Sequence, residues 1–247
     1  MELPRFVWRA LRSRYRDHAA ELAAIRKHID PDGIACDVGA NKGSFLFWLA
    51  RWSARAVAFE PQRDLAEYLE RMCVASGLSN VKVEAKAVHA AAGTMDLFIP
   101  YGHKPGASLV REGLPTSRVE TVKVPVVALD DYFSPHERVS VLKVDVEGAE
   151  VGVFKGAERI LRQCRPLLVF ECEARHHQCG GMQAVFSYLA KFGYEGSFVE
   201  RGRVQPLAMF REDVHQRCEG EWFWKHAGYC PNFIFESVAP DAVASPG

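Results

Sequence analysis

Short apolar runs alternate along the chain with segments whose apolar residues repeat at helical spacing. Continuous or alternating apolar runs predict strands, and apolar residues that recur every three or four positions predict helices. The expected strands cover residues 34–38, 56–60, 81–87, 95–99, 119–127, 139–145, 167–172, 194–199, 203–209 and 230–236. The expected helices cover residues 44–53, 62–76, 149–162 and 182–192. Strands that alternate with helices indicate right-handed crossovers and a mainly parallel sheet, so the predicted fold class is α/β.

The first thirty residues differ in pattern from the rest. They form an arginine-rich amphipathic arm, and one helical face is expected to carry Leu11, Tyr15, Leu22, Ile25 and Ile29. An α/β domain is expected over residues 31–237, followed by a disordered tail over residues 238–247. Residues 1–29 could lie on an anionic membrane surface or dock on a second copy of the chain, although packing on the domain itself is the simpler expectation.

Composition narrows the class of protein. A chain of 247 residues with formal net charge zero fits one α/β domain, and its charge gives no argument for a nucleic-acid partner. The seven cysteines are an odd number and are scattered, so a disulfide framework is not expected and a reducing compartment fits best. The sequence shows no apolar run of membrane-spanning length and no signal-peptide core. We therefore expect a cytoplasmic protein.

The segment Asp-Val-Gly-Ala-Asn-Lys-Gly at residues 37–43 follows an expected strand and opens an expected helix. Gly39 and Gly43 would let the backbone turn tightly and approach a ligand. A dinucleotide-binding turn would carry a further glycine where this chain has Asn41. The carboxylate of Asp37 would repel a phosphate but not a cofactor with positive charge, so an adenosine cofactor without phosphates, such as S-adenosylmethionine, fits the turn.

Glu60 ends the next expected strand, about twenty residues after the glycine turn. A carboxylate at that position in a nucleotide-binding fold accepts hydrogen bonds from ribose hydroxyls. The alternative is that Glu60 only favours the start of helix 62–76 through its negative charge. Position and spacing together favour the ribose role.

The strand at residues 139–145 ends in a cluster of charged residues. In an extended strand, Lys143, Asp145 and Glu147 would share one face. Open α/β sheets bind ligands at the carboxyl ends of their strands. The alternative is a solvated strand end beside a helix N-terminus, but charges of both signs beside an apolar strand favour a site.

Six motifs in this order resemble the FkbM family of S-adenosylmethionine-dependent methyltransferases. They are Asp-Val-Gly-Ala-Asn-Lys-Gly at 37–43, Phe-Glu-Pro at 59–61, Leu-Lys-Val-Asp-Val-Glu-Gly-Ala-Glu at 142–150, Phe-Lys-Gly-Ala at 154–157, Val-Phe-Glu at 169–171 and Asn-Phe-Ile-Phe at 232–235. The resemblance implies a class I methyltransferase fold, a Rossmann-like three-layer sandwich whose seven-stranded sheet has an antiparallel last strand. It also implies methylation of a hydroxyl group on a sugar or natural product. The cofactor residues implied are Asp37, Gly39, Ala40, Asn41, Gly43, Glu60, Pro61 and Ala87, with Asp145 and Glu147 at the methyl end.

Methylation of a hydroxyl requires an aligned acceptor and a group that takes its proton. The candidate bases are Asp145, Glu171, Glu173, His176 and His177, of which we expect Asp145 and Glu171 to orient the acceptor and remove the proton. The alternatives are a nicotinamide-dependent oxidoreductase, which Asp37 and Asn41 argue against, and a non-catalytic descendant that keeps the fold for binding.

Three further segments carry candidate chemistry. Cys172, His176, His177 and Cys179 are zinc-ligand types, but their spacing matches no zinc signature, so we expect no metal. Residues 100–118 are rich in glycine and proline and either cover the acceptor site or form an idle surface loop. Trp222, Trp224 and Tyr229 could stack on a sugar ring, or they could simply pack in the core.

Overall fold

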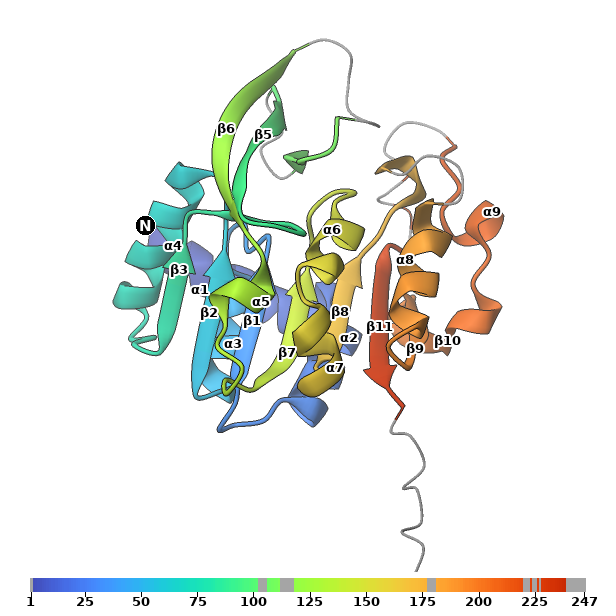
Figure 1. Ribbon diagram of the computed structural model, residues 1–247, viewed down its shortest axis with the longest axis horizontal. Coiled ribbons are helices and arrows are strands. Elements are labelled where there is room, and N and C mark those ends of the chain that lie inside the picture. Colours follow the sequence, from blue (N-terminus) through green and yellow to red (C-terminus); the bar gives the residue numbers. More distant parts are fainter. Residues whose placement is uncertain are drawn as a thin grey trace, which may run out of the picture.

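An eight-stranded sheet forms the centre of the molecule, in the order β10-β9-β11-β8-β7-β1-β2-β3 (Figure 1). The computed structural model describes residues 2–101, 106–111, 118–176, 181–219, 223, 226 and 228–238. The strands of this sheet are β1 (Ile34–Val38), β2 (Arg55–Phe59), β3 (Val81–Glu84), β7 (Val139–Val144), β8 (Leu167–Glu171), β9 (Tyr194–Glu200), β10 (Arg203–Pro206) and β11 (Asn232–Ser237).

The strand directions confirm the expected class of sheet with one addition. β3, β2, β1, β7 and β8 are parallel to one another, and β11 is antiparallel to both β8 and β9. The sheet has one strand more than the seven expected, because β10 joins its edge as the second strand of a hairpin with β9. The two residues between them, Arg201 and Gly202, have φ of 48° and 74°, as the common two-residue hairpin turn requires.

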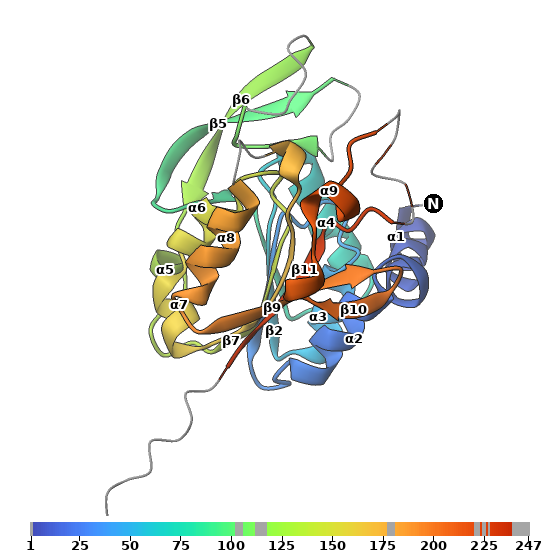
Figure 2. The same ribbon diagram turned by 90° about the vertical axis from the view of Figure 1, so that its right-hand side faces the viewer.

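Helices cover both faces of the sheet, which Figure 2 shows nearly edge-on. One face carries α1 (Glu2–Arg12), α2 (Ala19–His28), α3 (Leu46–Trp52) and α4 (Arg63–Ala75), and the other carries α5 (Leu129–Tyr132), α6 (Glu150–Lys155), α7 (Glu158–Gln163) and α8 (Gly181–Ala190). A short helix, α9 (Glu212–His215), lies near β9 and β10. Successive strand residues point to opposite faces, so Cys36 and Val38 join the core with α6–α8 while Ala35 joins the core with α1–α4. This arrangement is the expected three-layer sandwich.

The arginine-rich arm packs on the sheet as one of these layers. Leu22, Ile25 and Ile29 are buried, as expected. The expected positions of Leu11 and Tyr15 are wrong, since both are exposed and Phe6 and Ala10 are buried in their place. The arm is interrupted by a π-helical turn, Ser13–Asp17, which shifts the helical register between α1 and α2, so one periodicity cannot hold across both.

Two predicted elements are divided. The helix expected over residues 149–162 is α6 and α7, with a break at Gly156, where a Cβ would lie 2.2 Å from the carbonyl oxygen of His89. The strand expected over residues 81–87 is β3 followed by β4 (Ala87–Val88), which belongs to a second sheet of order β4-β6-β5. In that sheet β5 (Gly93–Pro100) and β6 (Val119–Val127) form a long antiparallel ladder that rises above the carboxyl ends of the parallel strands (Figure 1).

The cysteines that the structure describes are all free: Cys36, Cys73, Cys164, Cys172, Cys218 and Cys230. Over the described ranges, therefore, the chain lacks a disulfide framework, as its odd cysteine count predicts. Across the same part of the chain, none of the helices combines the length and apolar character that crossing a membrane would require.

Candidate functional site

The glycine turn after β1 lies directly against the chain that leaves β7. The backbone N–H of Gly39 donates to the carbonyl of Phe59 at 2.9 Å, and the N–H of Asp145 donates to the carbonyl of Val38 at 3.0 Å. Gly39 has φ of 74°, and a Cβ there would lie 1.8 Å from the carbonyl oxygen of Asp145. Glycine is therefore required at position 39 both for the turn and for this close approach.

Glu60 fastens the glycine turn to the start of α4. Its Oε2 accepts the backbone N–H of Asn41 at 2.8 Å, and its Oε1 accepts the backbone N–H of Gln62 at 2.9 Å. The side chain is 3 % exposed, and burial raises the pKa of Glu60 from 4.5 to about 7, although both N–H groups act to lower it. Each carboxylate oxygen accepts two hydrogen bonds, so the helix-start role and the ribose role are compatible.

Asp37 is held away from the pockets by an ion pair. Its carboxylate is buried, and the ammonium of Lys143 lies 3.2 Å from Oδ1, 3.5 Å from the carboxylate of Asp145 and 3.1 Å from the carbonyl oxygen of Gly39, to which it donates. Burial raises the pKa of Asp37, and Lys143 opposes that shift. The sequence alone led us to expect that the charge of Asp37 selects a cationic cofactor. Because Lys143 balances that charge, Asp37 cannot do so by itself.

A pocket, the first cavity of this site, opens beside the glycine turn. Its lining combines polar residues, among them Asn41, Glu60 and Asp145, with apolar ones. The Oδ1 atom of Asn41 is buried and finds no hydrogen-bond partner within the described part of the chain. The lining residues are Val38, Gly39, Asn41, Phe59, Glu60, Pro61, Gln62, Lys86, Ala87, Val88, Leu97, Ala107, Leu109, Asp145 and Val146.

A second cavity shares Gly39, Asn41 and Asp145 with the first. More of its lining residues carry charged or polar side chains, and two of them, Arg9 and His18, come from the helical arm. The ring of His18 packs on Phe45, with centroids 5.0 Å apart. The lining residues are Arg9, His18, Gly39, Ala40, Asn41, Lys42, Ser44, Phe45, Lys143, Val144, Asp145, Val169, Phe170, Glu171 and Asn232.

Asp145 lines both cavities, whereas Glu171 lines the second. Oxygen atoms of Asp145, Glu147 and Glu171 lie within 4.8 Å of one another. Burial, together with the charges of Asp145, Glu147 and Glu173, holds the pKa of Glu171 well above its usual range. The structure therefore brings the two expected catalytic carboxylates together at one end of the glycine turn.

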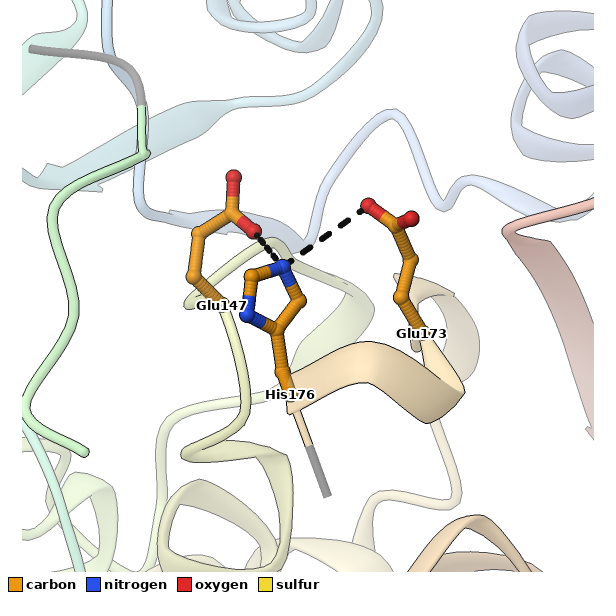
Figure 3. Close-up of side chains that lie close together, drawn as sticks. All are labelled: Glu147, Glu173 and His176. Carbon is orange, nitrogen blue, oxygen red and sulfur yellow. Dashed lines mark ion pairs between the residues drawn. The ribbon is translucent and has the colours of Figure 1, made fainter. Parts of the chain in front are cut away.

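Glu147 leaves the β7 face and pairs with His176 (Figure 3). Its φ of 51° turns it off the strand, so it does not continue the face of Lys143 and Asp145 as expected. His176 Nε2 lies 2.7 Å from a carboxylate oxygen of Glu147 and 3.9 Å from one of Glu173. Glu173 in turn accepts two hydrogen bonds from Arg175, at 2.7 and 2.9 Å, and one from the hydroxyl of Tyr229 at 2.5 Å. By residue type Glu147, Glu173 and His176 could hold a divalent cation, as could Asp145, Glu147 and Glu171, and Glu147 is already paired with His176.

The structure separates the other expected site residues into three groups. Glu60, Pro61 and Ala87 line the first cavity, Ala40 lines the second, and Gly39, Asn41 and Asp145 line both. Asp37, Gly43 and Glu147 are absent from both linings, and a Cβ on Gly43 would lie 2.8 Å from the side chains of Phe6 and Leu69. His177, Cys179, Trp222 and Trp224 lie outside the described residues, while Cys172 is buried in the core.

The loop expected to cover the acceptor is nearer to the first cavity. Of residues 100–118, the structure describes 100–101, 106–111 and 118, and Ala107 and Leu109 line the first cavity. Ser108 forms an isolated bridge with Phe98 of β5, and its hydroxyl donates to the carbonyl oxygen of Glu147 at 2.6 Å. Nothing in the local sequence signals these contacts, because β5 and the end of β7 are far apart in the chain.

Glu60→Gln is expected to change how stability depends on pH. The folded-state pKa of Glu60 is raised from 4.5 to about 7, so its contribution to stability is fully present below pH 4.5 and is lost as the pH rises through 7. A shift of about 2.5 units corresponds to ~3 kcal/mol. In urea denaturation between pH 5 and 8, the wild-type free energy of unfolding should therefore fall by up to ~3 kcal/mol more than that of the variant. Glu67→Gln, at an exposed position of α4, is the control, and parallel curves for wild type and Glu60→Gln would contradict the assignment.

Comparison with known proteins identifies the family of this chain. The family model described as the methyltransferase FkbM domain matches residues 37–195. The fold is similar to that of a methyltransferase FkbM from Methylobacillus flagellatus KT, with TM-score 0.54 and 15% identity over 84% of this chain and 44% of that one. This chain therefore spans less than half the length of that protein. No curated protein matches the sequence.

Two further solved structures share the fold over nearly their whole length. SMU.1697c of Streptococcus mutans, assigned as a methyltransferase and solved in complex with SAH, has TM-score 0.52 and 10% identity over 90% of this chain and 97% of that one. An rRNA methylase from Streptococcus thermophilus has TM-score 0.50 and 14% identity over 89% and 94% of the two chains. At such identities these likenesses establish the fold alone. The expected fold class and the expected cofactor, S-adenosylmethionine, are those of the family that the sequence itself matches, and the chain belongs to the FkbM methyltransferase family.

Proposed function

We propose that this protein transfers the methyl group of S-adenosylmethionine to a hydroxyl oxygen of a sugar or natural product. The observation that carries the proposal is the position of Asp145, which lines two adjacent cavities at the glycine turn. The first cavity combines acceptors with apolar residues, as an adenosine would require, and the second contains a second carboxylate, Glu171. Family membership favours a methyltransferase over the nicotinamide-dependent oxidoreductase considered above.

The first cavity suits the adenosine part of the cofactor. Glu60 would accept hydrogen bonds from the ribose hydroxyls, and the unpartnered Oδ1 of Asn41 would accept one more. Ala87, Leu97 and Leu109 offer apolar surface for the adenine ring. Asp37 would act indirectly, by fixing Lys143 beneath the turn.

Charge balance supports a cationic ligand at the junction of the cavities. Asp145, Glu147, Glu171 and Glu173 lie close together. Among the lysines and arginines that the structure describes, only Lys143, which pairs with Asp145, and Arg175, which pairs with Glu147 and Glu173, form ion pairs with them. The bound cofactor would supply a methyl group activated by a positively charged sulfur. The crowding of acids that holds the pKa of Glu171 well above its usual range favours such a group at the end of the first cavity that Asp145 forms.

The second cavity would hold the acceptor. Its lining offers donors on Arg9, Lys42 and Lys143 and acceptors on Asp145 and Glu171, which suits a molecule with several hydroxyl groups. Asp145 and Glu171 would orient the attacking hydroxyl and take its proton, which ends on a carboxylate oxygen. Alignment of the hydroxyl with the methyl group would account for much of the rate, since positioning alone can supply up to ~7–11 kcal/mol. A small molecule or a saccharide fits this lining better than a nucleic acid.

The proposal is tested by cofactor binding and methyl transfer measured on the same protein. Calorimetry with S-adenosylhomocysteine should show binding at one site per chain, and NADH should show none. Labelled S-adenosylmethionine, incubated with a panel of sugars and polyhydroxylated natural products, should yield a labelled ether. Binding without transfer to any hydroxyl would favour the non-catalytic alternative, and transfer only to nitrogen or carbon acceptors would contradict O-methylation.

A further inference from the structure

The outer face of α1 and of the turn that follows it exposes three large side chains in eight residues. Trp8 is 56 % exposed, Leu11 is 42 % exposed and Tyr15 is 74 % exposed. Trp8 and Leu11 are three residues apart and lie on one side of α1. Tyr15 follows in the π-helical turn, where its ring also meets that of Trp48 edge-on at 6.4 Å. The remaining exposed large apolar side chains of the described residues, such as Val74 and Met209, are scattered over other elements. Scattered apolar residues are usual on a protein surface, whereas a group gathered on one segment, with two aromatics, indicates an interaction surface.

A stripe of arginines runs along the same segment. Arg5, Arg12 and Arg16 are exposed. On the helix surface they lie beside the apolar side chains. The guanidinium of Arg12 lies 5.3 Å from the ring centroid of Trp8. Two acids share this surface: Asp17, paired with Arg12 at 2.8 Å, and Glu2, paired with Arg71 of α4 at 3.6 Å. The net charge of the face is therefore positive.

The opposite side of the same helix is fixed to the domain. Phe6 and Ala10 are fully buried, and the ring of Phe6 meets that of Phe47 edge-on at 5.7 Å. The indole N–H of Trp48 donates to the carbonyl oxygen of Ala10 at 2.7 Å. The outer face is therefore presented by a helix that the core holds in place at the outside of the molecule (Figure 2).

We propose that this face, made of Trp8, Leu11, Tyr15, Arg5, Arg12 and Arg16, docks the protein on an anionic lipid bilayer. Indole and phenol rings favour the level of the lipid headgroups, and each arginine near an anionic surface adds to the attraction. A second copy of the chain is the less suitable occupant, because a two-fold contact on this face would bring like-charged arginine stripes together. Arg9 points from the same helix into the lining of the second cavity, so docking would place the rim of that cavity near the membrane.

Vesicle sedimentation tests this docking on the full chain and without cofactor, so its result is independent of the proposed methyl transfer. The wild-type protein should sediment with vesicles of phosphatidylglycerol and phosphatidylcholine, and not with phosphatidylcholine alone. Binding should weaken as salt is raised from about 0.05 to about 0.5 M, because the Debye length shortens. The double variant Arg12→Glu/Arg16→Glu should lower the partition coefficient at least roughly tenfold, and Trp8→Ser should lower it by about fivefold.

Matched controls separate docking from general effects of charge and apolarity. Val74→Ser removes an 82 % exposed apolar side chain from α4, and Arg63→Glu/Arg203→Glu reverses two exposed charges on other elements. Both controls should bind vesicles about as wild type does, and all variants should keep the wild-type circular dichroism. Equal binding to neutral vesicles, or equal losses in the controls, would overturn the proposal. A wild-type dimer that Trp8→Ser dissociates, with no vesicle binding, would assign the face to a second copy and overturn it too.

Discussion

Asp145→Asn is expected to lower the rate of methyl transfer by roughly 10²–10⁴-fold while leaving the affinity for S-adenosylhomocysteine, which lacks the sulfonium charge, within about threefold. Asparagine keeps the size of the side chain and its place between the two cavities, but it cannot take a proton. The backbone N–H of residue 145 would still donate to Val38, so the turn should keep its shape. Single-turnover rates with labelled cofactor, together with calorimetry of S-adenosylhomocysteine, measure both quantities.

Glu171→Gln is the matched comparison for this experiment, since it makes the same change at the other carboxylate of the second cavity. The pKa of Glu171 is held well above its usual range by burial and by neighbouring acids, so its proton-accepting form gains population only as the pH rises. If Glu171 takes the proton, the rise of the rate with pH should disappear in Glu171→Gln and persist in Asp145→Asn. An Asp145→Asn enzyme with undiminished turnover would remove Asp145 from the mechanism.

The fold followed from features that are local in the sequence. Apolar strands such as residues 34–38 and 139–144 and the glycine turn between β1 and α3 are encoded by adjacent residues, and their order fixes a parallel sheet. The carboxyl ends of β1, β2 and β7 then had to meet, which brought Gly39, Glu60 and Asp145 to one cavity as expected.

The errors came from contacts between residues that are distant in the chain. Leu11 and Tyr15 have the right spacing for a buried face, but the π-helical turn and the packing of Phe6 decide which side of α1 faces the sheet. Arg9 and His18 in the second cavity, and Ala107 and Leu109 in the first, depend on how the arm and the β5–β6 hairpin pack. The ion pair of Asp37 could not be foreseen either, because its partner, Lys143, is 106 positions away.

Lys143 is therefore expected to contribute strongly to the free energy of unfolding. Its side chain is 8 % exposed, and it pairs with the nearly fully buried Asp37 and with Asp145 while donating to the glycine turn. Lys143→Met would keep most of the side-chain volume but leave the Asp37 carboxylate buried without its counter-ion. Breaking a buried ion pair from one side costs ~3–5 kcal/mol, so the free energy of unfolding in urea at pH 7 should fall by that amount.

Two companion variants decide whether the lost ion pair, and not lost packing, causes the effect. In Asp37→Asn/Lys143→Met the buried charge is gone as well, and stability should recover by at least about half, because a neutral pair costs far less to bury than a lone carboxylate. Lys82→Met removes an exposed lysine that pairs with Glu84 at 2.7 Å, and it should cost less than ~1 kcal/mol. Equal losses in Lys143→Met and in the double variant would show that Lys143 acts through packing alone. Recovery would instead show that Asp37 and Lys143 support the cofactor turn as one neutral unit, which explains an acidic residue at the end of β1 without any contact to the cofactor.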